Sequence, residues 1–226
     1  MTPGRAVGRA ARRVALSVGV TLVAAGLLSS TLSAQETDVS GRPAEPTIVG
    51  VTGGWNVNDG LWKPEAGTET VGGIVLGGFV NAATSLSWFG VRAEILWTQR
   101  GLDVVDDAGA PAGSVRADYL TFAIHARAAT DVGPVRFHLA AGPTVDQTVQ
   151  RRVDAQLGPA LNREVGTAFG VHAGAGAGFT VAERYRIELE ARWFEGLSDA
   201  HAGDFLSVRN RSFELLTRVG IPRPRS

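Results

Sequence analysis

Ser198, Asp199 and His201 carry the three side-chain types of a nucleophilic triad within four consecutive positions. Such catalysis needs a hydroxyl nucleophile beside a histidine, and a carboxylate that orients the histidine. Triad members are brought together by folding and are rarely sequence neighbours. The stretch GLSDA (196–200) also lacks the second glycine of a G-x-S-x-G nucleophile elbow. The sequence therefore predicts that the protein is not an enzyme.

Candidate metal and phosphate sites are equally sparse. Asp103, Asp106 and Asp107 could offer carboxylates to Ca²⁺, but an oxygen cage needs six or more ligands, so a solvated acidic loop is the expected structure. The glycines of GAGAG (174–178) lie within a strand-like pattern and open no helix, which argues against a phosphate loop. The chain has no cysteine. We expect no metal and no cofactor.

The stretch YRIELEARWF (185–194) alternates apolar and charged residues without interruption. Strand side chains point to opposite faces in turn, so Ile187, Leu189 and Trp193 share one face while the charges share the other. In a soluble sheet the charged face would meet water. In a membrane barrel the apolar face would meet lipid and the charged face would line the interior.

Similar strand-like runs recur along the chain, and none shows the helical spacing of apolar residues. We expect strands at about 47–57, 70–82, 88–99, 115–129, 134–148, 164–181, 184–195 and 212–221. The connections between them alternate: 58–69, 100–114, 149–163 and 196–211 are long, whereas 83–87, 130–133 and 182–183 are short. Outer-membrane barrels have this asymmetry. The predicted fold is an all-β, eight-stranded, antiparallel, up-and-down transmembrane β-barrel with short periplasmic turns and long extracellular loops.

The charged face of these strands predicts an interior polar network. An eight-stranded barrel has an interior just wide enough for side chains to fill, so inward charges should pair and form a plug instead of lining a channel. Inward glycines at 174, 176 and 178 would leave room for long arginine side chains. The predicted members of the network are Arg92, Glu94, His125, Arg127, Arg136, His138, Arg186, Glu188, Glu190, Arg192, Glu214 and Arg218.

The N-terminus has the three parts of a secretory signal peptide. Four arginines precede the apolar run VALSVGVTLVAAGLL (14–28), and small residues follow it up to Ala34. An uncleaved anchor helix is the alternative. Without those four arginines, the 22 basic and 22 acidic side chains become a net charge of −4, which gives no reason to expect nucleic-acid binding. We expect a signal peptide at 1–34, a flexible segment at 35–46, a barrel at 47–222 and a C-terminal tail at 223–226.

The order of several short motifs resembles the PorT-type outer-membrane β-barrel family over about residues 47–221. The elements are Glu94, Gln99-Arg100-Gly101, Tyr119-Leu120, Gly142-Pro143, Gly196-Leu197-Ser198-Asp199 and Arg209-Asn210-Arg211-Ser212. The resemblance implies an integral barrel in the outer membrane of a Gram-negative-type bacterium, and it implies no single activity. The chain departs from the wider pattern by ending GIPRPRS without a terminal aromatic.

The sequence thus predicts a monomeric, exported outer-membrane barrel that contacts outer-membrane lipid and is not a channel. Its role would be structural, or would be binding of envelope proteins or an extracellular ligand through the long loops, particularly 149–163 and 196–211. The alternative is a soluble exported β-barrel that binds a small apolar ligand. The direction in which the charged face points distinguishes these two structures.

Overall fold

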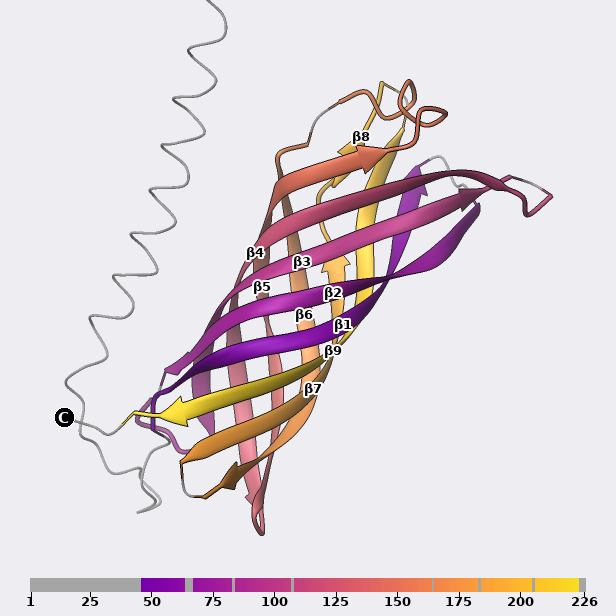
Figure 1. Cartoon of the computed structure of the whole chain (residues 1–226). Coiled ribbons are helices and arrows are strands. Elements are labelled where there is room, and N and C mark those ends of the chain that lie inside the picture. Colours follow the sequence, from indigo (N-terminus) through magenta and orange to yellow (C-terminus); the bar gives the residue numbers. More distant parts are fainter. Residues whose placement is uncertain are drawn as a thin grey trace, which may run out of the picture.

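The computed structural model describes residues 46–223, apart from residues 64–66, 83, 107, 164, 183 and 205. Long, strongly tilted strands wrap around a common axis (Figure 1). No helix among the described residues has the length and apolarity needed to cross a membrane. The strands are β1 (Ile48–Lys63), β2 (Gly67–Ala82), β3 (Phe89–Val105), β4 (Pro111–Val132), β5 (Val135–Val153), β6 (Thr167–Val181), β7 (Tyr185–Gly196), β8 (His201–Ala202) and β9 (Ser207–Pro222).

Each long strand pairs antiparallel with the next along the chain, and β1 pairs with β9 to close the ring. Eight long strands therefore form the wall, and the two-residue β8 only extends the ladder beside β9. The Arg223 N–H donates to the Thr47 carbonyl (2.7 Å), which ties the two ends of the barrel chain together. We call this the terminal end and the opposite one the far end. The predicted all-β, up-and-down barrel is confirmed.

The strands are longer at the far end than the sequence predicted. The supposed loops 58–69 and 100–114 are mostly strand, and only residues 64–66 and 106–110 separate the strands there. The other two long connections shorten to 154–166 and 197–206. Strands that project into water carry polar residues on their outer face, so the apolar alternation used to recognise them fades. The turns at the terminal end are short, as predicted.

An apolar band encircles the outside of the barrel. Along β7, the outward residues from Tyr185 to Trp193 are all apolar. Along β9, the outward residues from Phe213 to Ile221 are apolar except Thr217. Each of these two stretches spans nine residues. Transmembrane strands need about 9–11 residues. Toward the far end, the outward residues then become polar at Glu195, next to Trp193. The same change occurs on four other strands, at Asp59 of β1, Gln99 of β3, Asp118 of β4 and Arg211 of β9. This boundary matches the edge of a hydrocarbon layer.

Candidate functional site

All twelve residues of the predicted interior network are buried inside the ring. Arg92, Glu214 and Arg218 are fully buried, and the most accessible members, Arg136 and Arg186, are 9% exposed. The apolar residues that alternate with them face outward: Leu189 is 55% exposed and Trp193 43%. The two faces of each strand are therefore those of a membrane barrel, because a water-soluble barrel would keep Leu189 and Trp193 inside and the charges outside.

Glu94 on β3 joins two arginines that come from other strands. It accepts hydrogen bonds from Arg192 (2.6 Å) on β7 and from Arg218 (2.7 and 2.9 Å) on β9. The His125 imidazole lies 3.6 Å from the same carboxylate. Since β3 and β7 are not neighbours in the ring, these contacts cross the interior and connect opposite walls.

Glu188 and Glu190 on β7 form the adjacent layer toward the terminal end. The Arg92 guanidinium donates to Glu188 (2.7 Å) and to Glu190 (2.6 Å), so one side chain links both carboxylates. Arg127 donates to Glu188 (2.7 Å), and His138 lies 2.8 Å from Glu190. Arginine suits this position because its fork of N–H donors can serve two acceptors at once.

The sequence reasoning missed one further interior pair, Arg100 and Asp146. Arg100 donates to Asp146, and its guanidinium stacks 3.8 Å from the centre of the Phe194 ring. Thr121 also donates to Asp146 (2.6 Å). The connection expected at 100–114 placed Arg100 outside the strands. Continuing the period-two pattern from Arg92 through Thr98 would have placed Arg100 inward.

Among the residues that the structure describes, the charges in the fully enclosed part of the interior are balanced. Five guanidinium groups, those of Arg92, Arg100, Arg127, Arg192 and Arg218, face five carboxylates, those of Glu94, Asp146, Glu188, Glu190 and Glu214. Arg136 and Arg186 lie nearer the terminal end, and Arg136 pairs with Asp131 (2.9 Å), which is half exposed. A balanced set of this kind avoids leaving an uncompensated buried charge, which is the main penalty of charge burial.

The glycines of β6 make room for this network. A Cβ atom at Gly176 would lie 2.6 Å from the His138 ring, and one at Gly174 would lie 2.5 Å from the Arg192 Cβ. Both distances are shorter than van der Waals contact. The steric interpretation of the glycine run is therefore the one that the geometry supports, and these backbone positions lie in a strand, not at a helix start.

At the far end, a second cluster of side chains covers the charged layers. Trp62, Leu102, Val115 and Val208 point inward from four strands, and Leu161 from the 154–166 connection packs among them. We call residues 154–166 and 197–206 the cap. The cap is held to itself by a bridge between Arg163 and Ala202. Leu161 of the cap and the inward side chains of the four strands together form a small hydrophobic core that covers the far end of the interior.

The structure does not bring the three residues of the suggested triad together. Ser198 Oγ accepts from the Phe169 N–H (2.8 Å), and His201 Nε2 lies 3.5 Å from the Tyr119 hydroxyl. His201, expected in a loop, is buried in β8. Burial lowers the pKa of His201 to about 3, and the nearby Arg151 guanidinium contributes to the same shift. A neutral, buried imidazole here serves the packing of the cap.

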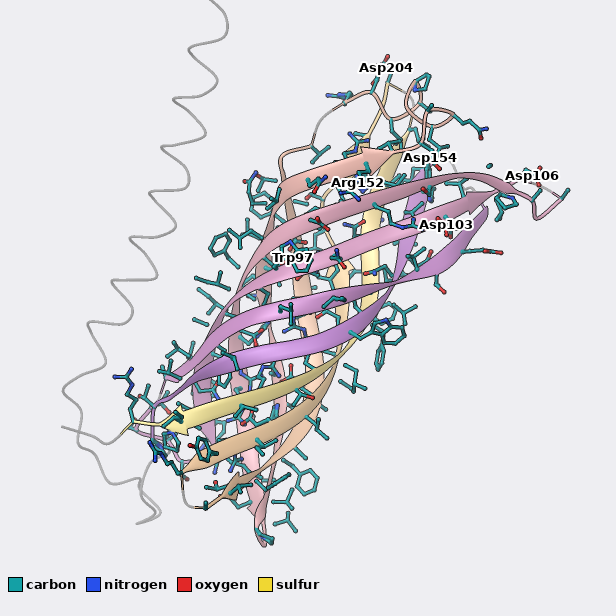
Figure 2. The ribbon with its side chains drawn as sticks, viewed as in Figure 1. Trp97, Asp103, Asp106, Arg152, Asp154 and Asp204 are labelled. Carbon is teal, nitrogen blue, oxygen red and sulfur yellow. The ribbon has the colours of Figure 1, made fainter. Side chains whose placement is uncertain are left out.

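The aspartates of the suggested calcium site are also engaged elsewhere. Asp103 pairs with Arg116 (2.8 Å) on the outer surface, while Asp106 Oδ1 accepts from the backbone N–H groups of Ala108 and Ala110. Figure 2 shows Asp103 and Asp106 on the far-end extension of the β3–β4 hairpin. Asp107 lies outside the described residues. No group of three or more metal-ligating side chains occurs among the residues that are described.

Comparisons with known proteins agree with this geometry. The chain matches none of the curated proteins. Two solved structures have the same fold. OprG from Pseudomonas aeruginosa has a TM-score of 0.52 at 8% identity, with 79% of this chain and 96% of that chain covered. Neisserial surface protein A (NspA) has a TM-score of 0.50 at 14% identity, with 80% and 100% covered.

The family comparison extends the likeness from fold to sequence. A family model described as the outer membrane protein beta-barrel domain matches residues 21–215, which is most of the chain. The match includes all strands from β1 to β7 and most of β9. With its outward apolar band and inward charges, this chain belongs to the outer membrane β-barrel domain family, whose members reside in the outer membrane.

Proposed function

We propose that this protein is a closed, monomeric outer-membrane barrel of the PorT type that presents a binding surface at its far end. The observation that carries the proposal is the balanced set of ten buried charges that connects opposite walls beneath the packed cap. Such an interior offers structural rigidity in place of a water-filled path. The contacts of the protein with its surroundings are then made by lipid around the band and by partners at the far end.

The orientation in the membrane follows from the strand ends. Short turns, the start of β1 and the end of β9 lie at the terminal end, and the end with the short turns faces the periplasm in outer-membrane barrels. The far end, with its projecting strands and the cap, would face the outside of the cell. Residues 1–34 would serve as the signal peptide that directs export. The partners would be envelope proteins or an extracellular ligand, and nucleic acid is not among them.

Fractionation tests the membrane assignment directly. After cell breakage, membranes are washed with high salt and then at alkaline pH, and the protein is followed by immunoblot. We expect it to stay with the membranes and to migrate differently on a gel with and without heating. Release into the supernatant would instead support the soluble exported barrel that binds a small apolar ligand.

Conductance tests the closed interior. The purified barrel is reconstituted into planar bilayers, and current is recorded under an applied voltage. We expect no steady single-channel steps, because guanidinium and carboxylate groups of opposite walls are in direct contact. Reproducible steps that disappear with a variant of the interior would refute the closed-barrel proposal.

A further inference from the structure

Two arginines face each other on the outer surface near the far end of the barrel. The β4–β5 ladder pairs Arg116 with Arg152. Their chain neighbours Val115 and Val153 pack into the far-end hydrophobic cluster, so the two arginines point to the outer face. Figure 2 shows Arg152 on the far-end part of the wall, beyond Trp97. Like charges directly opposite each other destabilise a sheet, so this pair calls for a compensating group.

Arg116 is compensated from the β3 side. Its Nη2 lies 2.8 Å from the Asp103 carboxylate, and its Nη1 donates to the carbonyls of Leu102 (2.9 Å) and Val115 (3.1 Å). These contacts hold the guanidinium group toward β3, and β3 lies on the opposite side of β4 from β5. The ion pair of Arg116 is therefore directed away from Arg152.

Arg152 has no such partner. None of the described carboxylates lies within ion-pair distance of its guanidinium group. With its amide oxygen turned toward the arginine, Gln150 would accept from Arg152 Nη2 (2.9 Å) and Nε (3.1 Å). An amide carries no net charge, so the positive charge of Arg152 remains uncompensated among the described residues.

The other carboxylates near the pair are directed to other groups. Asp118, the outward residue of β4 next to Arg116, accepts from Gln99 Nε2 of β3 (3.3 Å). Asp154 accepts from the backbone N–H of Ser114 (2.8 Å). The acidic side chains are thus held toward β3 and at the strand end. The β5 side of this face presents a guanidinium group.

The pair lies just beyond the apolar band. On β4 the outward residues become polar at Asp118, and Arg116 is the next outward residue. Two residues span about 7 Å along a strand, which is about 5 Å along the membrane normal for a strand tilted by about 40°. The headgroup layer is about 5–7 Å thick on each side, since a bilayer measures about 40–45 Å with its headgroups and about 30 Å without them. The two arginines therefore lie at the level of lipid phosphates.

We propose that Arg152, with Arg116 opposite it, binds the phosphate group of a lipid in the outer leaflet. A guanidinium group suits a phosphate, and the anion would neutralise the like-charged pair. The acyl chains of the same lipid would continue along the outward apolar residues of β4, Leu120 and Phe122. The inference rests on the proposed function in one respect, that the far end faces the outside of the cell. It adds a site and the chemical class of its ligand.

Native mass spectrometry of the purified barrel in detergent micelles tests the proposal. The probes are dioctanoyl phosphatidic acid, which carries a phosphate monoester, and dioctanoyl phosphatidylcholine, whose phosphate is neutralised by choline. We expect phosphatidic acid to bind saturably and about tenfold more tightly than phosphatidylcholine. Equal affinity for the two lipids would overturn the proposal.

Charge variants locate the binding. Arg152→Gln should weaken the binding of phosphatidic acid about tenfold, because it removes the uncompensated guanidinium group. Arg211→Gln is the matched control, since Arg211 is also an outward arginine beside the band but has Glu195 as its partner (3.0 Å). Asp118→Asn should strengthen the binding, because it removes a neighbouring negative charge. An equal loss in Arg211→Gln, or no loss in Arg152→Gln, would refute the site.

Stability provides a second measurement in which the effect changes sign. In neutral detergent, Arg152→Gln should raise the urea midpoint slightly, because it removes a like-charged pair. With saturating phosphatidic acid the same variant should unfold at a lower midpoint than the unchanged chain, because only the unchanged chain binds the lipid tightly. A variant that is less stable in both conditions would mean that Arg152 serves the wall itself, and the proposal would fail.

Competition identifies the source of the phosphate. Inorganic phosphate in about tenfold excess over the lipid should not displace it, because the band contributes to lipid binding. Displacement would assign the pair to a soluble anion and overturn the lipid assignment. Failure here is distinguishable from failure of the proposed function. A barrel that stays in washed membranes but does not discriminate between the two lipids refutes only this inference, whereas release into the supernatant refutes the proposed function.

Discussion

Replacement of Glu94 by alanine is the sharpest test of the interior network. The carboxylate accepts three hydrogen bonds from two guanidinium groups, Arg192 and Arg218, and all three side chains are at most 2% exposed. In the variant, both guanidinium groups keep their charge but lose this acceptor. The interior then carries one uncompensated positive charge in a place that water does not reach.

The magnitude follows from the contrast between buried and exposed ion pairs. Removing one partner of a buried pair costs about 3–5 kcal/mol, because the remaining charge stays desolvated. An exposed pair is worth about 1 kcal/mol or less. The barrel contains a matched control: Glu195 accepts from Arg211 (3.0 Å) on the outer surface, where the two side chains are 29% and 33% exposed. We expect Glu94→Ala to lower the free energy of unfolding by about 3–5 kcal/mol and Glu195→Ala by about 1 kcal/mol or less.

Urea unfolding in lipid vesicles, followed by tryptophan fluorescence, measures this difference. With a slope of about 2–3 kcal/mol per molar urea, the midpoint should fall by about 1–2.5 M for Glu94→Ala and by less than about 0.5 M for Glu195→Ala. Glu94→Gln retains one acceptor oxygen and should lie between them. Equal shifts for Glu94→Ala and Glu195→Ala would mean that water or rearranged neighbours solvate the two guanidinium groups, and the account of a dry, paired interior would be refuted.

Three further changes test other parts of the structure. Gly176→Ala should lower the free energy of unfolding by about 1–3 kcal/mol in the same urea assay, because the new Cβ would press on His138; Gly53→Ala, whose Cβ meets its nearest neighbour at 3.6 Å, is the tolerated control. Leu189→Arg should reduce membrane insertion and cost about 2–4 kcal/mol, because Leu189 faces lipid, and normal insertion would contradict the position of the band. The pKa of His201 is about 3 in the closed cap, against an ordinary value of 6.5. As the pH falls below 6.5, the imidazole therefore binds a proton in the opened cap but stays neutral in the closed cap. The free energy that keeps the cap closed should fall by about 2 kcal/mol by pH 5. Hydrogen exchange of residues 197–206 should show this loss, and it should be absent in His201→Gln.

The sequence was sufficient to predict the two faces of the strands within the apolar band. There, lipid on one side and paired charges on the other impose the same period-two alternation, so Arg92 and Glu94 could be placed inward from their parity alone. The number of long strands and their antiparallel order followed from the same runs and from the short turns at the terminal end.

Outside the band the period-two alternation weakens, and the predicted strand ends at the far end were wrong for a physical reason. Water lies on the outer face of the projecting strands, so polar and glycine-containing stretches such as 58–63 and 101–105 look like loops. The inward residues Trp62 and Leu102 were then not recognised as the floor of the cap. The end of the β1–β2 ladder at Asn58↔Val71 could not be predicted either, because the Asn56 side chain there bonds to a backbone carbonyl of β3.

The interior charges also explain how this barrel selects one register. A one-residue slip of a strand exchanges its two faces, and a barrel that was apolar on both sides would meet little resistance to it. Here a slip of β7 would turn Arg186, Glu188, Glu190 and Arg192 toward lipid. Each arginine at the bilayer midplane costs about 2–4 kcal/mol, and the carboxylates left on the opposite wall would lose their partners as well. A buried network that adds little net stability over a hydrophobic core can therefore still distinguish the native register strongly from its nearest competitors. This accounts for charges in a place where packing alone would favour leucine.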